Sequence, residues 1–180
     1  MTVFGSDATF QANWSNVGDF LARVGLGWDS SKTYDQLGTI SSDFAFTRSI
    51  TGGLTYIGIY GWSVSPLVEY YIMEDWVGSR PTGGGTKVDT FTIDGEGTYD
   101  VYQHTQVNQP SITGSNATFP QFFSIRQEAR QCGHISISEH FKRWASKGLA
   151  LGKMEEARIL VEAMNNTGSI EFTTATVVVN

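Results

Sequence analysis

PLVEYYIMEDW, residues 66–76, has the length and the apolar and aromatic content of a β-strand that is buried in a fold. Successive side chains of an extended chain point to opposite faces, so Leu67, Glu69 and Tyr71 share one face. The other face is apolar as well, and YIGIYGW (56–62) has the same character. We therefore expect a sheet covered on one side by a second sheet, with a ligand cleft on its concave aromatic side.

The rest of the chain repeats this pattern. Alternating apolar runs recur from residue 8 to residue 179, and Gly, Asn, Asp or Ser occupies nearly every gap between them. The chain has 20 Gly, 11 Phe, 7 Tyr and 5 Trp, and only 17% of its residues are charged. These features predict an all-β fold of about eleven strands in two packed, curved antiparallel sheets. At 180 residues the chain is most simply a single domain, 1–180.

One segment, about 137–147, breaks the alternation. Phe141 and Trp144 follow helical spacing, and Ser136 with Glu139 forms a potential capping box at the start. We predict a single helix here, with its aromatic stripe packed on the back of a sheet.

Charge and composition exclude several functions. The net charge of −6 and the twelve dispersed Lys and Arg residues argue against a nucleic acid or an anionic membrane as partner. A single cysteine, Cys132, rules out an internal disulfide, and the three histidines, His104, His134 and His140, lack the spacing of a metal site. The sequence contains no apolar run of membrane-spanning length and no signal peptide, although a processed leader would leave the same sequence.

Two glutamates interrupt strands that are otherwise apolar. Glu69 lies between Leu67 and Tyr71, and Glu162 shares its face with Leu160 and Met164. Burial without a cation raises the pKa of a carboxyl group. Each glutamate alone is explained by a half-exposed strand, but two such carboxylates form the pair that glycoside hydrolysis requires.

Several stretches, in order from about residue 9 to the C-terminus, resemble the family 11 glycoside hydrolases, which are small endo-1,4-β-xylanases. The most specific are PLVEYYI and the pair QPSITG and FSIRQ. The resemblance implies a β-jelly roll shaped like a partly closed hand, with a thumb loop at about 106–120 that closes over a xylan chain in the cleft. It further implies retaining hydrolysis, no metal or other cofactor, and secretion.

The resemblance also implies roles for individual residues. Glu69 matches the nucleophile and Glu162 the acid/base catalyst, while Asp19 matches a residue that modulates the pKa of the acid/base carboxyl. An Asp at this position resembles the pattern of acid-active members, because a coupled carboxyl pair titrates at lower pH. The expected substrate-binding residues are Tyr60, Trp62, Tyr71, Pro110, Ser111, Ile112 and Gln121.

Three features depart from the family pattern. The chain begins after the usual N-terminal strands, which exposes a strand edge and makes a dimer possible where a monomer is expected. Gln106 replaces an arginine of many members, and Glu155 or Glu156 replaces a tyrosine. A further acid there is expected to raise the pKa of Glu162 or to weaken sugar binding.

Two other functions are compatible with an aromatic trough. One is a non-catalytic xylan-binding β-sandwich with a degraded cleft, and the other, with less support, is a cellulase on a related jelly roll. The binding module has no need of two facing carboxylates.

Overall fold

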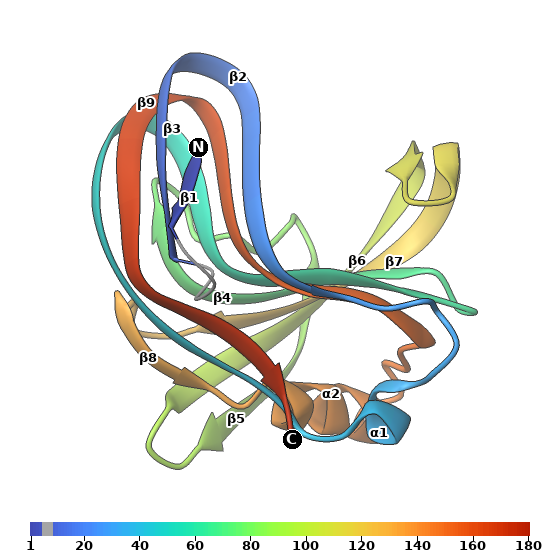
Figure 1. The fold of residues 1–180 in the computed structure, drawn as a ribbon. Helices are drawn as coiled ribbons and strands as arrows, with labels where there is room; N and C mark the ends of the chain where they lie inside the picture. The colour runs from blue at the N-terminus through green and yellow to red at the C-terminus, as the bar shows by residue number, and fades with distance from the viewer. Residues whose placement is uncertain (5–8) are drawn as a thin grey trace.

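The computed structural model describes residues 1–4 and 9–180 and consists mostly of β-strands (Figure 1). The strands of the described residues form one continuous sheet in the order β1-β2-β9-β3-β4-β7-β6-β5, with β8 paired to β3. This sheet curves over itself, so the two predicted layers are two parts of one β-jelly roll. The elements are β1 (Thr2–Phe4), β2 (Thr9–Gly27), α1 (Tyr34–Leu37), β3 (Ile40–Val64), β4 (Val68–Val77), β5 (Thr86–Ile93), β6 (Gly97–Ser111), β7 (Gly114–Arg126), β8 (Cys132–Ile135), α2 (Ile137–Ser146) and β9 (Lys153–Val179).

The described chain has nine strands rather than the predicted eleven, because six predicted runs merge into three strands and β1 is a strand that the sequence did not predict. The Gly and Asn residues between them predict turns that end strands, but the strands pair on both sides of these positions, with a register shift between Trp14 and Val17 of β2. The merged runs are 8–14 with 20–28 in β2, 42–50 with 54–62 in β3, and 157–164 with 169–179 in β9.

The three longest strands, β2, β3 and β9, arch over together at one end of the molecule (Figure 1). Asn16, Gly52, Gly53 and Asn165 have positive φ angles of 49°, 84°, 42° and 53° in this region. Gly52 lies opposite Asn166, so the bends of β3 and β9 are side by side. Gly and Asn tolerate this backbone region best, which lets neighbouring strands turn together without losing their pairing.

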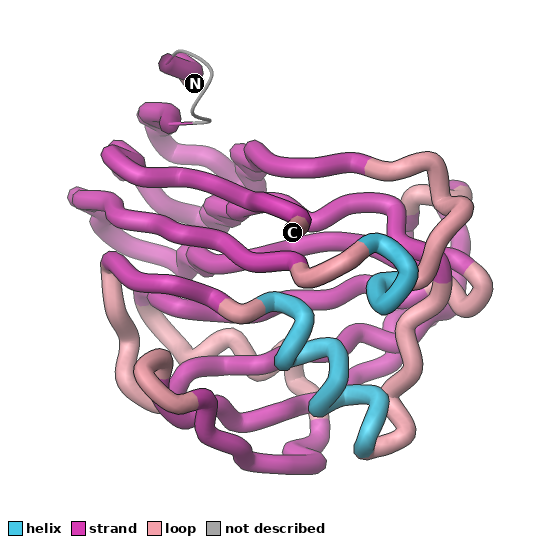
Figure 2. The backbone as a smooth tube through the Cα atoms, turned by 60° about the horizontal axis from the view of Figure 1, so that its bottom comes forward, coloured by secondary structure: helices cyan, strands magenta, loops and turns pink. Residues whose placement is uncertain are grey.

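The predicted helix is confirmed as α2, and it packs on the back of the sheet. Phe141 and Trp144 are 1% and 0% exposed, and the indole of Trp144 donates to Oγ of Ser124 at 2.9 Å. The ring of Phe141 also meets that of Tyr70 edge-on at 5.0 Å. Figure 2 shows α1, a single turn that the sequence did not predict, beside α2.

The predicted capping box of α2 is wrong. Ser136 Oγ donates to a carboxylate oxygen of Glu96 at 2.5 Å instead of capping the helix, and the Glu139 side chain pairs with Lys142 at 2.7 Å. A tertiary hydrogen bond to Glu96, in the turn between β5 and β6, therefore replaces the local hydrogen bonds of a capping box. The start of α2 is held to the sheet by Glu96, which also accepts from the Ser136 backbone N–H at 3.1 Å.

The sheet has two apolar faces. The main core lies on the side covered by α2, and a second cluster of buried side chains lies on the other face. These side chains form the floor on which the candidate site is built. The second cluster consists of Tyr60, Trp62, Tyr71, Met73, Phe119, Phe123, Ile125 and Leu160.

Candidate active site

Strand register gathers the predicted site residues on this second face. Glu69 of β4 lies opposite Trp62 of β3 on one side and opposite Gln121 of β7 on the other. Two residues along β4, Tyr71 lies opposite Tyr60. Because alternate residues share a face, all five side chains are presented together.

Glu69 is 8% exposed and its carboxylate accepts three hydrogen bonds. The hydroxyls of Tyr60 and Tyr71 donate to Oε1 at 2.9 Å and 3.0 Å, and the amide of Gln121 donates to Oε2 at 2.5 Å. Burial raises the pKa of Glu69, while these donors and the positive charge of Arg23 oppose that rise. Donors of this kind stabilise the ionised form and fix the direction of the carboxylate.

Glu162 of β9 has different surroundings. It lies opposite Leu21 of β2 and Tyr56 of β3, and its carboxylate makes no hydrogen bond to the described residues. Burial, the charge of Asp19 and the charge of Glu69 raise the pKa of Glu162 to about 7, against a smaller lowering by Arg23. The pKa of Glu69 is still raised overall by burial, but its three donors favour the anion, whereas Glu162 lacks such donors and its pKa lies near neutral.

Both glutamates open into one cleft of about 360 Å³, a volume within the range of ligand-binding clefts. Since the charge of Glu69 raises the pKa of Glu162, the two carboxyl groups are close enough to interact. The cleft brings together nine of the ten residues predicted for the site. Its lining consists of Asp19, Leu21, Arg23, Tyr60, Trp62, Glu69, Tyr71, Pro110, Ser111, Ile112 and Glu162.

Gln121 is the predicted substrate-binding residue that does not line the cleft. Its amide nitrogen is engaged with Glu69, and its carbonyl oxygen accepts from the amide of Gln106 at 3.1 Å. Gln106 thus donates to Gln121, and Gln121 donates to Glu69, so two uncharged side chains form a series of hydrogen bonds that ends at the Glu69 carboxylate.

The predicted thumb is the hairpin of β6 and β7, which stands out from the rest of the sheet (Figure 1). Pro110 and Ser111 end β6, and Ile112 lies in the short turn before β7. Ile112 is 42% exposed, and all three residues line the cleft that holds Glu69 and Glu162. The tip of the hairpin therefore forms part of the wall of the cleft.

Arg23 and Leu21 line the cleft but were not predicted. Both follow Asp19 at alternate positions of β2, so they share its face. The alternation that places Glu69 and Glu162 on the cleft face also places Leu21 and Arg23 there once Asp19 is assigned to that face.

Glu155 and Glu156 do not have the predicted effect on Glu162. Glu156 forms ion pairs with Arg23 at 2.9 Å and with Arg158 at 2.6 Å, and Glu155 accepts a hydrogen bond from Ser30. Neither acid is among the groups that raise the pKa of Glu162. The expectation that one of them raises that pKa is therefore wrong.

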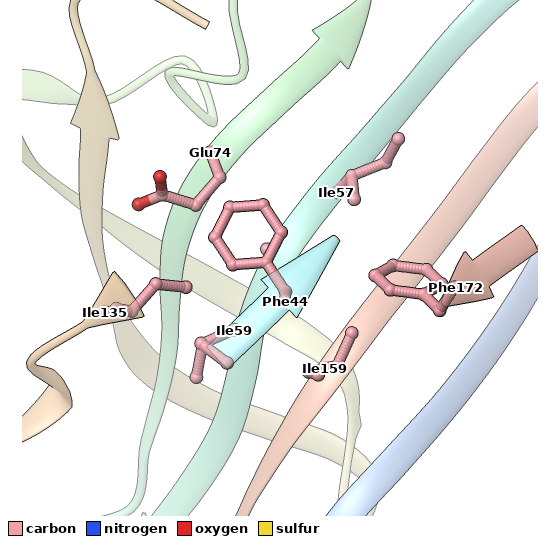
Figure 3. A pocket seen from close by; sticks show the side chains of 8 residues that line it. Phe44, Ile57, Ile59, Glu74, Ile135, Ile159 and Phe172 are labelled. Atoms are coloured by element: carbon pink, nitrogen blue, oxygen red, sulfur yellow. The ribbon is translucent and has the colours of Figure 1, made fainter. Parts of the chain in front are cut away.

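Another buried carboxylate, Glu74, lies on the other face of β4 and borders a small internal cavity (Figure 3). Glu74 is fully buried, accepts from the Tyr99 hydroxyl at 2.7 Å and pairs with Arg130. The other labelled side chains around the cavity are apolar, and its volume of about 10 Å³ admits no more than about one water. Glu74 therefore has a structural environment, whereas Glu69 and Glu162 line the open cleft.

Among residues 1–4 and 9–180, no group of three His, Cys, Asp or Glu side chains converges as metal ligands would. Within the same residues, no helix is long and apolar enough to cross a membrane.

Two carboxyl groups in unlike surroundings, in one cleft of a curved jelly roll, define a protein of the glycoside hydrolase class. The chain belongs to family 11 of that class, since the family described as "Glycosyl hydrolases family 11" matches residues 1–173.

Individual relatives agree with this assignment. The chain is 47% identical over 173 residues to "Endo-1,4-beta-xylanase C" of Fibrobacter succinogenes, covering 94% of this chain and 28% of that protein. It is 46% identical over 165 residues to "Endo-1,4-beta-xylanase A" of Bacillus pumilus, covering 92% of this chain and 70% of that protein. The crystal structure of wild-type ENZbleach xylanase superposes with a TM-score of 0.89 at 41% identity, covering 96% of this chain and 71% of the other. The chain thus spans under a third of the Fibrobacter protein.

Proposed function

We propose that the protein hydrolyses internal β-1,4-xylosidic bonds of xylan with retention of configuration, with Glu69 as nucleophile and Glu162 as acid/base. The observation that carries the proposal is the contrast between the two carboxyl groups within one cleft. Glu69 has three hydrogen-bond donors, and the pKa of Glu162 is raised to about 7 by burial, Asp19 and Glu69. The names of the relatives support xylan as the substrate.

The first step uses both carboxyl groups. Glu69 attacks the anomeric carbon while Glu162 gives its proton to the glycosidic oxygen, so the glycosidic bond breaks and a xylosyl ester of Glu69 forms. The negative charge of Glu69 is lost in this ester, and the pKa of Glu162 falls because one of the charges that raised it has gone.

In the second step Glu162 acts as a base. It takes a proton from a water molecule whose oxygen attacks the anomeric carbon, and the ester bond to Glu69 breaks. The sugar leaves with its original β configuration, and both glutamates return to their starting protonation states. Tyr60, Tyr71 and Gln121 keep Glu69 aimed at the anomeric carbon throughout.

The open shape of the cleft favours attack within a chain rather than at its end. Its lining is aromatic and polar, which suits the faces and hydroxyls of sugar rings. Xylan is a polymer that does not enter a cell readily, so we propose that the enzyme acts outside the cell.

The experiment measures reducing ends released from xylan by the native protein and by Glu69→Ala, Glu162→Ala and Glu171→Gln. Glu171 is an exposed residue of β9 and serves as the control. We expect both alanine variants to lose nearly all activity and the control to keep it.

Azide then distinguishes the two roles on an aryl xylobioside. With Glu69→Ala we expect an α-xylobiosyl azide, because azide replaces the nucleophile in a single inversion. With Glu162→Ala we expect the β-azide, because azide attacks the ester of Glu69. Xylan binding by the native protein without any release of reducing ends would support a binding module and refute hydrolysis.

A further inference from the structure

Arg23 of β2 is a cation in a cleft whose other charged lining residues are acids. Its Nη1 lies 2.9 Å from Oε1 of Glu156, and Nε of Arg158 lies 2.6 Å from the other oxygen of that carboxylate. The Glu156 side chain is 11% exposed and that of Arg23 is 38% exposed. Glu156 is therefore fixed by two arginines and in turn anchors the guanidinium at the cleft wall.

Arg23 is also linked to Glu69 indirectly, through the aromatic ring of Tyr60. Its Cζ lies 5.2 Å from the ring centroid of Tyr60, within the range of a cation–π contact. The hydroxyl of Tyr60 accepts from the indole of Trp62 and donates to Oε1 of Glu69 at 2.9 Å. A continuous series of contacts therefore runs from Glu156 through Arg23 and Tyr60 to Glu69.

The titratable and charged groups near the two glutamates come from β2, β3 and β4. The thumb tip and Gln121 of β7 lie beside the glutamates but carry no charge. The positive charge of Arg23 lowers the pKa of Glu69 and of Glu162, opposing burial at both sites. The titratable and charged groups facing the pair are Asp19 and Arg23 of β2, Tyr56 and Tyr60 of β3, and Tyr71 of β4, while Glu156 and Arg158 of β9 form the ion pairs behind Arg23.

We propose that Arg23 is a positioning residue of the catalytic centre, which holds the Tyr60 ring against Glu69 and supplies the fixed positive charge of the cleft. This inference rests on the function proposed above. Arginine suits the task because its planar guanidinium pairs with a carboxylate and lies over an aromatic face at the same time. A lysine at this position keeps the charge but not the planar contact.

The test compares Arg23→Met, Arg23→Lys and a matched control, Arg143→Met. Arg143 of α2 also pairs with a carboxylate, that of Asp89 at 2.5 Å, and its Cζ lies 5.7 Å from the ring centroid of Phe91. Its side chain is 36% exposed, close to the value for Arg23, but it lies outside the cleft. The control therefore removes the same kind of contact from another part of the molecule.

Two measurements are made on each protein. The first follows the side-chain carboxyl signals of Glu69 and Glu162 by ¹³C NMR over a pH titration, which does not depend on activity. The second is the pH profile of kcat/KM on an aryl xylobioside.

We expect Arg23→Met to raise both pKa values by less than about one unit each and to move the whole activity profile to higher pH. The maximal kcat/KM should fall by roughly tenfold as Tyr60 loses its support. Arg23→Lys should restore the pH profile but only part of the rate, and Arg143→Met should change neither.

Unchanged carboxyl titrations in Arg23→Met, or equal shifts in Arg143→Met, would overturn the inference. A rate loss without a pH shift in Arg23→Met would reduce Arg23 to a packing role and would also overturn it. If the native protein releases no sugar, the proposed function fails, and the NMR titration still decides the electrostatic role of Arg23.

Discussion

Gln121 and Glu69 lie opposite each other across the parallel pair β4–β7, and the Gln121 amide donates to the Glu69 carboxylate at 2.5 Å. The hairpin that carries the thumb thus supplies a donor directly to the proposed nucleophile. The carboxylate of Glu69 depends on two strands that come together only in the folded state.

We expect Gln121→Leu to lower kcat/KM by roughly 10- to 100-fold, because a hydrogen bond to a charged group contributes about 1.5 to 3 kcal/mol. The pKa of Glu69 should rise, so the acid limb of the pH profile should move to higher pH. Gln127→Leu is the matched control, since Gln127 donates to the Asp100 carboxylate at 3.0 Å outside the cleft. Equal losses in both variants would show that the effect is only structural.

Asp19 raises the pKa of Glu162 through its negative charge. Asp19→Asn should therefore lower the pKa of Glu162 from about 7, which a ¹³C titration of the Glu162 carboxyl would detect. Asp43→Asn removes an exposed carboxylate of β3 that does not line the cleft, and it should leave the Glu162 titration unchanged. The prediction is refuted if Glu162 titrates at the same pH with and without the Asp19 charge.

Glu162 should also limit the stability of the fold. Its pKa is raised from 4.5 to about 7 in the native state, so ionising it costs stability as the pH rises through this window. Glu162→Gln removes this cost and should increase the free energy of unfolding by up to about 3 kcal/mol above pH 7, with little gain below pH 4. Urea unfolding at pH 4 and pH 8 measures the difference. Glu171→Gln, on the exposed part of β9, should give no such pH-dependent gain.

His140 should limit stability in acid. It is fully buried in α2, and neither ring nitrogen has a hydrogen-bond partner among the described residues. Burial and the nearby charge of Arg130 lower its pKa to about 3, so stability is lost as the pH falls from 6.5 toward 3.

We expect the stability of His140→Leu relative to the native protein to improve steadily over that window, reaching on the order of a few kcal/mol near pH 3. Acid unfolding followed by circular dichroism measures this trend. His134→Leu removes an exposed histidine and should show no comparable trend. A constant difference across the pH range would mean that His140 contributes packing alone.

The meeting of Glu69 and Glu162 in one cleft was predictable because strand alternation is a local rule that holds wherever a sheet has two covered faces. Arg23 was not predicted, because a cation on a strand carries no signal until its neighbours are known. The role of Glu156 also depends on Arg23 and Arg158, which meet it only through strand pairing.

Other features could not be predicted from the sequence, for a different reason. Ser136 and Glu139 satisfied the local pattern of a capping box, yet Glu96, forty residues earlier, offered Ser136 a better-placed acceptor. Likewise Gly52 and Gly53 resemble residues that end a strand, and only the matching bend at Asn165 allows the pairing to continue. In both cases a contact distant in sequence outweighs a local preference.

The arch formed by β2, β3 and β9 has a thermodynamic consequence. Each of these strands is paired on both sides of its bend, so it belongs to both layers of the jelly roll. Neither layer therefore has enough strands of its own to be stable alone. Melting should consequently be a single cooperative transition, with calorimetric and van't Hoff enthalpies in agreement. The cleft should not lose its shape before the hydrophobic interior behind it does.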